Sequence, residues 1–154
     1  MPGAKVFIDS NVILYGRDAG GAEKTVKAND WLRAATAAGA AQANLQVLNE
    51  VTHVMLRKRN DLSPQAIFES IDQIAYLGQS PVSDVTVRLA RIVREQTSYS
   101  WWDCLLLASA IELGCTHFLS EDLQDGQTIE GPTSKGLTII DPFAHTPEQI
   151  LVSP

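Results

Sequence analysis

The chain has 154 residues, of which 45% are hydrophobic and 19% charged, a composition typical of a folded protein rather than a disordered one. This length suits one domain with a single core, and we expect residues 1–154 to form one domain with its core at about 5–143. The net charge of −6 argues against nucleic-acid binding through an overall positive field, but metal ions gathered by acidic residues would still allow it. No apolar run is long enough to span a bilayer and no signal peptide is evident, so we expect a cytoplasmic protein without a membrane partner.

The first predicted strand is Val6–Ile8, an apolar run suited to a buried position. It ends at Asp9, Ser10 and Asn11, before a short apolar helix over residues 12–16. In open α/β sheets, ligands bind outside the carboxyl ends of the strands, which makes Asp9 a site candidate. Asp, Ser and Asn are also preferred helix N-caps, so the sequence at this point leaves capping as an alternative role.

Apolar residues at helical spacing predict further helices over residues 24–38, 47–55, 64–78, 84–93 and 104–114. Glu50 borders the apolar stripe of its helix, where it is either part of a site or a solvated edge residue. Asp103 precedes the last of these helices, which is apolar on almost every side and is therefore predicted to be buried. Ser100 and Asp103 also fit a capping box, so Asp103 has the same two interpretations as Asp9.

The remaining predicted strands are residues 117–119 and 137–140, with weaker signals at 41–44 and 80–82. The predicted strand at 117–119, like the one at Val6–Ile8, is followed by acids, here Glu121, Asp122 and Asp125. We expect residues 126–136 to be a loop and the tail at 144–154 to be poorly ordered. Cys104 and Cys115 are expected to be structural thiols.

Strands separated by helices, with no hairpin signal, predict an α/β fold, a three-layer α/β/α arrangement around a central parallel sheet. Strands in such a sheet point the same way and the helices return antiparallel, so strand ends and helix starts share one edge. We therefore expect Asp9, Glu50, Asp103 and Asp122 to meet there. Oxygen ligands select Mg²⁺ or Mn²⁺, and a Mg²⁺ site of this kind suits phosphodiester hydrolysis.

Four motifs together resemble the PIN domain, specifically the VapC-like toxins of bacterial toxin–antitoxin pairs. They are Phe-Ile-Asp-Ser-Asn-Val-Ile-Leu-Tyr from Phe7, Asn-Glu-Val at 49–51, Ser-Trp-Trp-Asp-Cys-Leu-Leu-Leu-Ala-Ser-Ala from Ser100, and Phe-Leu-Ser-Glu-Asp-Leu-Gln-Asp-Gly from Phe118. The resemblance covers about residues 5–143 and implies a Mg²⁺-dependent ribonuclease, usually a homodimer, that a cognate antitoxin holds inactive.

On this resemblance, the four acids Asp9, Glu50, Asp103 and Asp122 fall on the acidic positions of the family, and Asn11 and Ser120 fall on its polar supports. Asp125 is a second acid near the fourth position, and the resemblance leaves open whether it or Asp122 reaches the metal.

We expect Asp9 and Asp103 to bind Mg²⁺ directly, and Glu50 and Asp122 to act through water or a second ion. Arg57 and Arg59 are candidates for contacts to the RNA backbone, with a plain surface pair as the alternative. A non-catalytic PIN-like scaffold, a receiver-type protein and a phosphatase are other interpretations, and DNA is an alternative substrate. The two-acid phosphatase is disfavoured because Asn11 stands where a second acid is needed.

Overall fold

The computed structural model describes residues 3–18, 20–132 and 136–151 of the chain. These residues include a five-stranded sheet with the strand order β2-β1-β3-β5-β4. The strands are β1 (Val6–Ile8), β2 (Ala41–Gln42), β3 (His117–Leu119), β4 (Thr128–Ile129) and β5 (Leu137–Ile140). The helices are α1 (Ser10–Gly16), α2 (Glu23–Ala37), α3 (Leu45–Lys58), α4 (Pro64–Ile74), the 3₁₀ helix η1 (Ala75–Leu77), α5 (Asp84–Gln96), α6 (Trp101–Glu112) and α7 (Pro147–Leu151).

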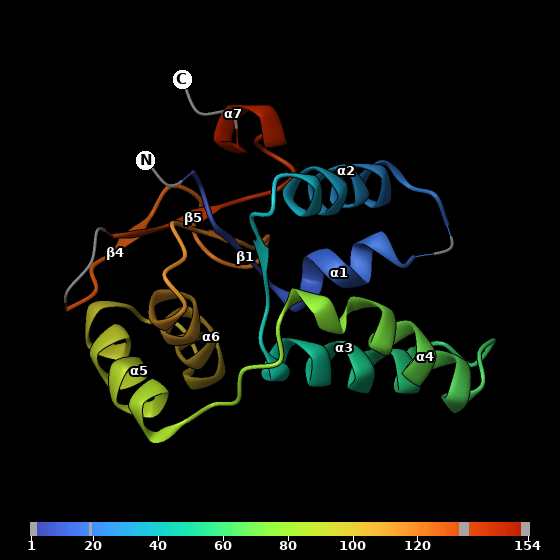
Figure 1. Cartoon of the computed structure of the whole chain (residues 1–154), viewed down its shortest axis with the longest axis horizontal. Helices are drawn as coiled ribbons and strands as arrows, with labels where there is room; N and C mark the ends of the chain where they lie inside the picture. The colour runs from blue at the N-terminus through green and yellow to red at the C-terminus, as the bar shows by residue number, and fades with distance from the viewer. Residues whose placement is uncertain (1–2, 19, 133–135, 152–154) are drawn as a thin grey trace.

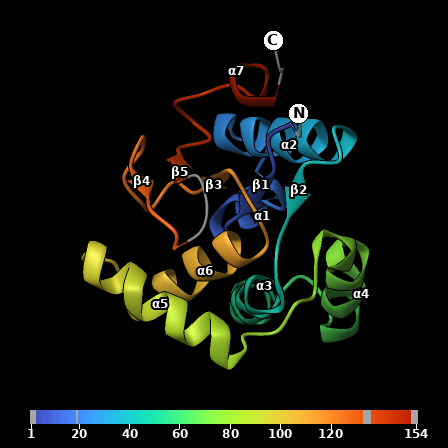
Figure 2. The same cartoon turned by 60° about the vertical axis from the view of Figure 1, so that its left-hand side comes forward.

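The sheet lies between two groups of helices, which confirms the predicted three-layer α/β/α architecture. Figure 2 shows α2 and α7 on one side of the sheet and α5 and α6 on the other. Helix α1 packs against both α2 and α3, and α3 packs against α4 (Figure 1). None of the helices in the described part of the chain is both long and apolar enough to cross a membrane.

Strand β1 is the centre of the core, since Val6, Phe7 and Ile8 are fully buried. The rings of Phe7 and Phe118 stack with their centroids 5.3 Å apart, which joins β1 to β3. In the parallel register of these strands Ile8 lies opposite Leu119. The residues that follow, Asp9 and Ser120, therefore leave the sheet side by side.

Four of the five strands are parallel, but β4 is not. Strand β4 pairs with β5 in the antiparallel direction, with Thr128 opposite Thr138. The prediction of a loop over residues 126–136 is therefore wrong at Thr128–Ile129, and the predicted parallel sheet carries one antiparallel strand at its edge. A two-residue edge strand with one buried side chain, Ile129, is too short to give a recognisable alternation.

Two further predictions are corrected. Residues 80–82 form no strand, and Pro81, which lacks an N–H group, could not donate to a ladder there. The tail was predicted to be poorly ordered, yet residues 147–151 form α7, which packs against α2 with Pro147 buried. The predicted strand at 41–44 is confirmed only at Ala41–Gln42.

The helix starts predicted at residues 64 and 84 are confirmed by their caps, whereas α6 starts at Trp101, three residues before the predicted 104. The hydroxyl oxygens of Ser63, Ser83 and Ser100 accept hydrogen bonds from backbone N–H groups three residues on, at 3.1, 3.3 and 3.2 Å. In α6 every side chain from Cys104 to Ala110 is buried, as its apolar composition predicts. Cys104 and Cys115 are free, buried thiols, in agreement with a structural role.

Candidate functional site

The site is built around Asp9, which follows β1 and is only 4% exposed. Its side chain accepts a hydrogen bond from the backbone N–H of Ser10 at 2.7 Å and thereby caps α1. Its second oxygen, Oδ2, accepts from the hydroxyl of Ser120 at 2.8 Å and from Nδ2 of Asn11 at 3.3 Å. Asp9 therefore both caps α1 and belongs to a cluster of polar side chains.

Asn11 joins the ends of the two central strands. Its Nδ2 donates to Ser120 Oγ at 3.1 Å and to Asp122 Oδ2 at 3.0 Å, in addition to Asp9. Its Oδ1 accepts from the backbone N–H of Glu121 at 3.4 Å. Asn11 and Ser120 thus both bond to the side chain of Asp9, and Asn11 links the carboxylates of Asp9 and Asp122.

Glu50 and Asp103 reach the same region from two helices. Glu50 lies in the second turn of α3, where its Oε1 accepts from Nε2 of Gln46 at 3.2 Å. Asp103 is the third residue of α6 and is half-buried, and its backbone N–H is capped by Ser100. Both carboxylates are close enough for their charges to act on Asp9.

These surroundings change the proton affinity of two acids. Burial raises the pKa of Asp9 from 3.8 to about 7; the hydrogen bonds from Ser120 and Ser10 lower it, while the charges of Glu50 and Asp103 raise it further. Burial also raises the pKa of Asp103, and the charge of Asp122 adds to that rise. The negative charges of the cluster are therefore only partly balanced by the hydrogen bonds that the acids accept.

The donor set fits a hard divalent cation in its chemistry, because it is made of carboxylate oxygens and its central anion, Asp9, is destabilised mainly by burial and further by the charges of Glu50 and Asp103. Within residues 3–18, 20–132 and 136–151, however, no three His, Cys, Asp or Glu side chains lie close enough together to hold one metal ion. The predicted acids thus share one edge of the sheet without converging on a common point.

Comparison with known families matches residues 6–124 to the PIN domain. The chain belongs to the PIN domain family. Among solved structures, a toxin–antitoxin complex from Klebsiella pneumoniae is similar, with a TM-score of 0.58 and 14% identity over 90% of this chain and 98% of the other. No curated protein matches the sequence closely enough to count as a relative.

Two more solved structures share the PIN fold. A VapC toxin of Mycobacterium tuberculosis, described as cleaving the sarcin–ricin loop, has a TM-score of 0.53 and 14% identity, over 74% of this chain and 87% of the other. The VapBC complex of Rickettsia felis, bound to a DNA fragment from its promoter, has a TM-score of 0.54 and 12% identity, over 75% and 86%. At such identities these structures establish the fold of the chain.

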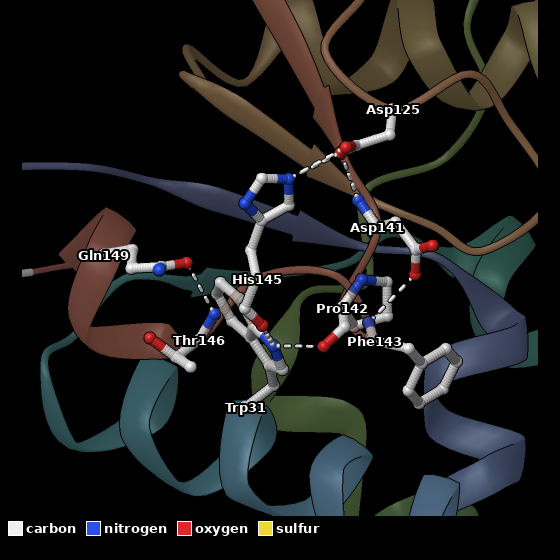
Figure 3. Close-up of polar contacts among 8 residues, drawn as sticks. All are labelled: Trp31, Asp125, Asp141, Pro142, Phe143, His145, Thr146 and Gln149. Atoms are coloured by element: carbon white, nitrogen blue, oxygen red, sulfur yellow. Dashed lines mark hydrogen bonds and ion pairs between the residues drawn. The ribbon is translucent and has the colours of Figure 1, made fainter.

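Asp125 lies just beyond the residues that match the PIN domain, and the structure directs it away from the other acids. Figure 3 shows its carboxylate against His145, whose Nε2 lies 2.9 Å from Oδ2 and 3.0 Å from Oδ1. The backbone N–H of Asp141 donates to the same carboxylate at 2.9 Å. Of the two acids that the sequence left open, Asp122 is the one bonded to Asn11, while Asp125 fastens the C-terminal segment to the end of the sheet.

A groove of about 430 Å³ begins at Asn11 and runs between α1 and α3. Its basic lining residues are Arg17, Lys58 and Arg59. Arg17 and Lys58 were not found from the sequence, because nothing local indicates that α1 and α3 face each other there. Of the predicted pair, Arg59 binds Asp61 through two hydrogen bonds of 2.9 and 2.8 Å, and Arg57 is an exposed residue of α3.

Proposed function

We propose that this PIN domain is a Mg²⁺-dependent endoribonuclease and the toxin of a toxin–antitoxin pair. The observation that carries the proposal is the buried carboxylate of Asp9, whose pKa is raised by burial and then by the charges of Glu50 and Asp103. A group of acids with this electrostatic penalty gains most from a bound cation. The toxin–antitoxin proteins among the similar folds give additional support for the biological role.

Each polar residue of the cluster has a proposed role. Asp9 and Asp103 would hold Mg²⁺ directly, with Mn²⁺ as the alternative ion, and Glu50 and Asp122 would act through water or a second ion. When bound, the ion would supply positive charge to the reacting phosphate and activate water.

Asn11 and Ser120 would keep the acidic oxygens in place through the hydrogen bonds described above. Ser120 is fully buried, so its hydroxyl is shielded from exchange with solvent and holds Asp9 in one orientation.

Cleavage should leave a 5′-phosphate and a 3′-hydroxyl. The test is incubation of the purified protein with RNA and Mg²⁺, followed by sequencing of the new ends. Asp9→Asn and Asp103→Asn should remove cleavage, whereas Asp72→Asn, at an exposed position on α4, should leave it unchanged. Cleavage that persists in excess chelator, or 2′,3′-cyclic phosphate ends, would contradict the mechanism. The same assay with single-stranded DNA decides between the two substrates.

The proposed partners are a cognate antitoxin and a second copy of the chain. An antitoxin bound at the acidic cluster should block cleavage and compete with Mg²⁺ for the protein. Co-expression with the product of an adjacent small gene tests the first partner, since the two should co-purify and the complex should be inactive. Light scattering of the purified toxin tests for the homodimer, and a mass equal to that of one chain would contradict it.

A further inference from the structure

Two adjacent tryptophans at the start of α6 lie on the surface. Trp102 is 65% exposed and Trp101 is 38% exposed, whereas Trp31 is only 1% exposed. Neither Trp101 nor Trp102 belongs to the cluster of buried core side chains in the described part of the chain. Tryptophan has a large apolar ring that is buried on average, so two neighbouring exposed indoles indicate a binding surface more than a structural need.

The two tryptophans directly precede Asp103 in the first turn of α6, so the turn that carries them also carries one of the acids. Gln46 joins this turn of α6 to Glu50 on α3. Its Nε2 donates to the backbone oxygen of Trp102 at 3.2 Å and to Oε1 of Glu50 at 3.2 Å. A single amide group thus fixes the first turn of α6 to one of the acids. The turn that carries both indoles is therefore held beside Glu50 and Asp103.

Three features follow one another along α3. Gln46 contacts Trp102 near the start of the helix, Glu50 lies one turn on, and Val54, Met55 and Lys58 line the groove that also holds Arg17 and Asp18. With a rise of 1.5 Å per residue, Glu50 is about 6 Å from Gln46 along the axis and about 12 Å from Lys58. An extended RNA chain lying along α3 would pass the indoles first, then the acids, and then the groove.

We propose that Trp101 and Trp102 form a stacking platform for an unpaired base of the RNA whose backbone lies at the carboxylates. The inference rests on the proposed nuclease function and adds the residues that would hold a base of the substrate. A base is neutral and presents an apolar face, so it can lie against an exposed indole without adding negative charge beside Asp103. Stacking on an indole also requires that the base be out of a duplex, and it works with any base.

The test uses the intrinsic fluorescence of the full chain in the non-cleaving Asp9→Asn background. A single-stranded oligoribonucleotide should quench the emission, and the signal should come from the two exposed indoles because Trp31 is buried. Trp102→Ala should weaken binding about 5- to 150-fold, the range measured for loss of one stacked base. Trp102→Phe should restore most of the affinity, whereas Trp102→Leu, which keeps apolar bulk without an aromatic face, should not. Phe68→Ala removes an exposed ring on α4 and should change nothing.

Oligonucleotides without bases and fully paired duplexes should bind the Asp9→Asn protein and its Trp102→Ala derivative equally. Binding of base-containing RNA that is unaffected by Trp102→Ala would overturn the proposal, as would a full rescue by leucine. A change in oligomeric state on Trp102→Ala, measured by light scattering, would also overturn it and assign the indoles to an interface between two copies of the chain. If the wild type shows no Mg²⁺-dependent cleavage, the proposed nuclease function is wrong. If the wild type cleaves RNA but Trp102→Ala does not change RNA binding, only the stacking platform is wrong.

Discussion

Replacement of Asp9 by asparagine tests the electrostatic basis of the site most directly. The rise of its pKa from 3.8 to about 7 corresponds to roughly 4 kcal/mol of unfolding free energy, at about 1.4 kcal/mol for each pKa unit. Because the folded protein binds this proton more tightly than the unfolded chain does, stability should fall as the pH rises from about 4 to about 7. Above that range the whole penalty is present, unless a cation relieves it.

The substitution also removes an acceptor. The carboxylate accepts from Ser10 N–H, Ser120 Oγ and Asn11 Nδ2, and an amide offers only one oxygen to these donors. One lost hydrogen bond in a buried position costs roughly 1 to 2 kcal/mol. We therefore expect Asp9→Asn to be about 2 kcal/mol more stable than the wild type at pH 8, and no more stable at pH 5.

The assay is urea unfolding at pH 5 and pH 8 in the presence of chelator, repeated at pH 8 with Mg²⁺. Mg²⁺ should stabilise the wild type and leave Asp9→Asn almost unchanged, since a ligand stabilises only the state that binds it. Asp72→Asn serves as the control for a carboxylate on the surface of α4 and should show no such pH dependence. If Asp9→Asn is less stable than the wild type at pH 8, the capping role of Asp9 dominates and the electrostatic reasoning is refuted.

Three further predictions concern Ser120, Lys58 and His145. Ser120→Ala removes a hydrogen bond that lowers the pKa of Asp9, so a carboxyl-carbon NMR titration should give a value above about 7, and an unchanged or lower value would contradict this. Lys58→Ala should weaken RNA binding and reduce the slope of log affinity against log salt by about 0.7, as expected for one contact to a single strand, and fluorescence anisotropy at several salt concentrations measures it. His145→Ala breaks the partly exposed pair with Asp125, so hydrogen exchange should quicken in residues 141–149, with at most about 1 kcal/mol lost in stability. RNA cleavage should survive that change, and its loss would place Asp125 in the active site.

Much of the fold could be predicted because its determinants are local in the sequence. The apolar run of β1, the caps Ser63, Ser83 and Ser100, and the apolar composition of α6 each act within a few residues. Edge strand β4 and helix α7 escaped prediction because their stability comes from packing against β5 and α2 rather than from their own short sequences.

The candidate site divides in the same way. The sequence by itself determined that Asp9 follows a buried strand and that Asp103 lies at the start of a buried helix, because apolar runs and helix caps are properties of neighbouring residues. Only the tertiary structure decided that Asn11 bonds Asp122 while Asp125 bonds His145, since each choice depends on the register of distant strands and on the path of the C-terminal segment. Contacts across more than a hundred residues, such as that of Asn11 with Asp122, arise when the core closes, and no local pattern encodes them.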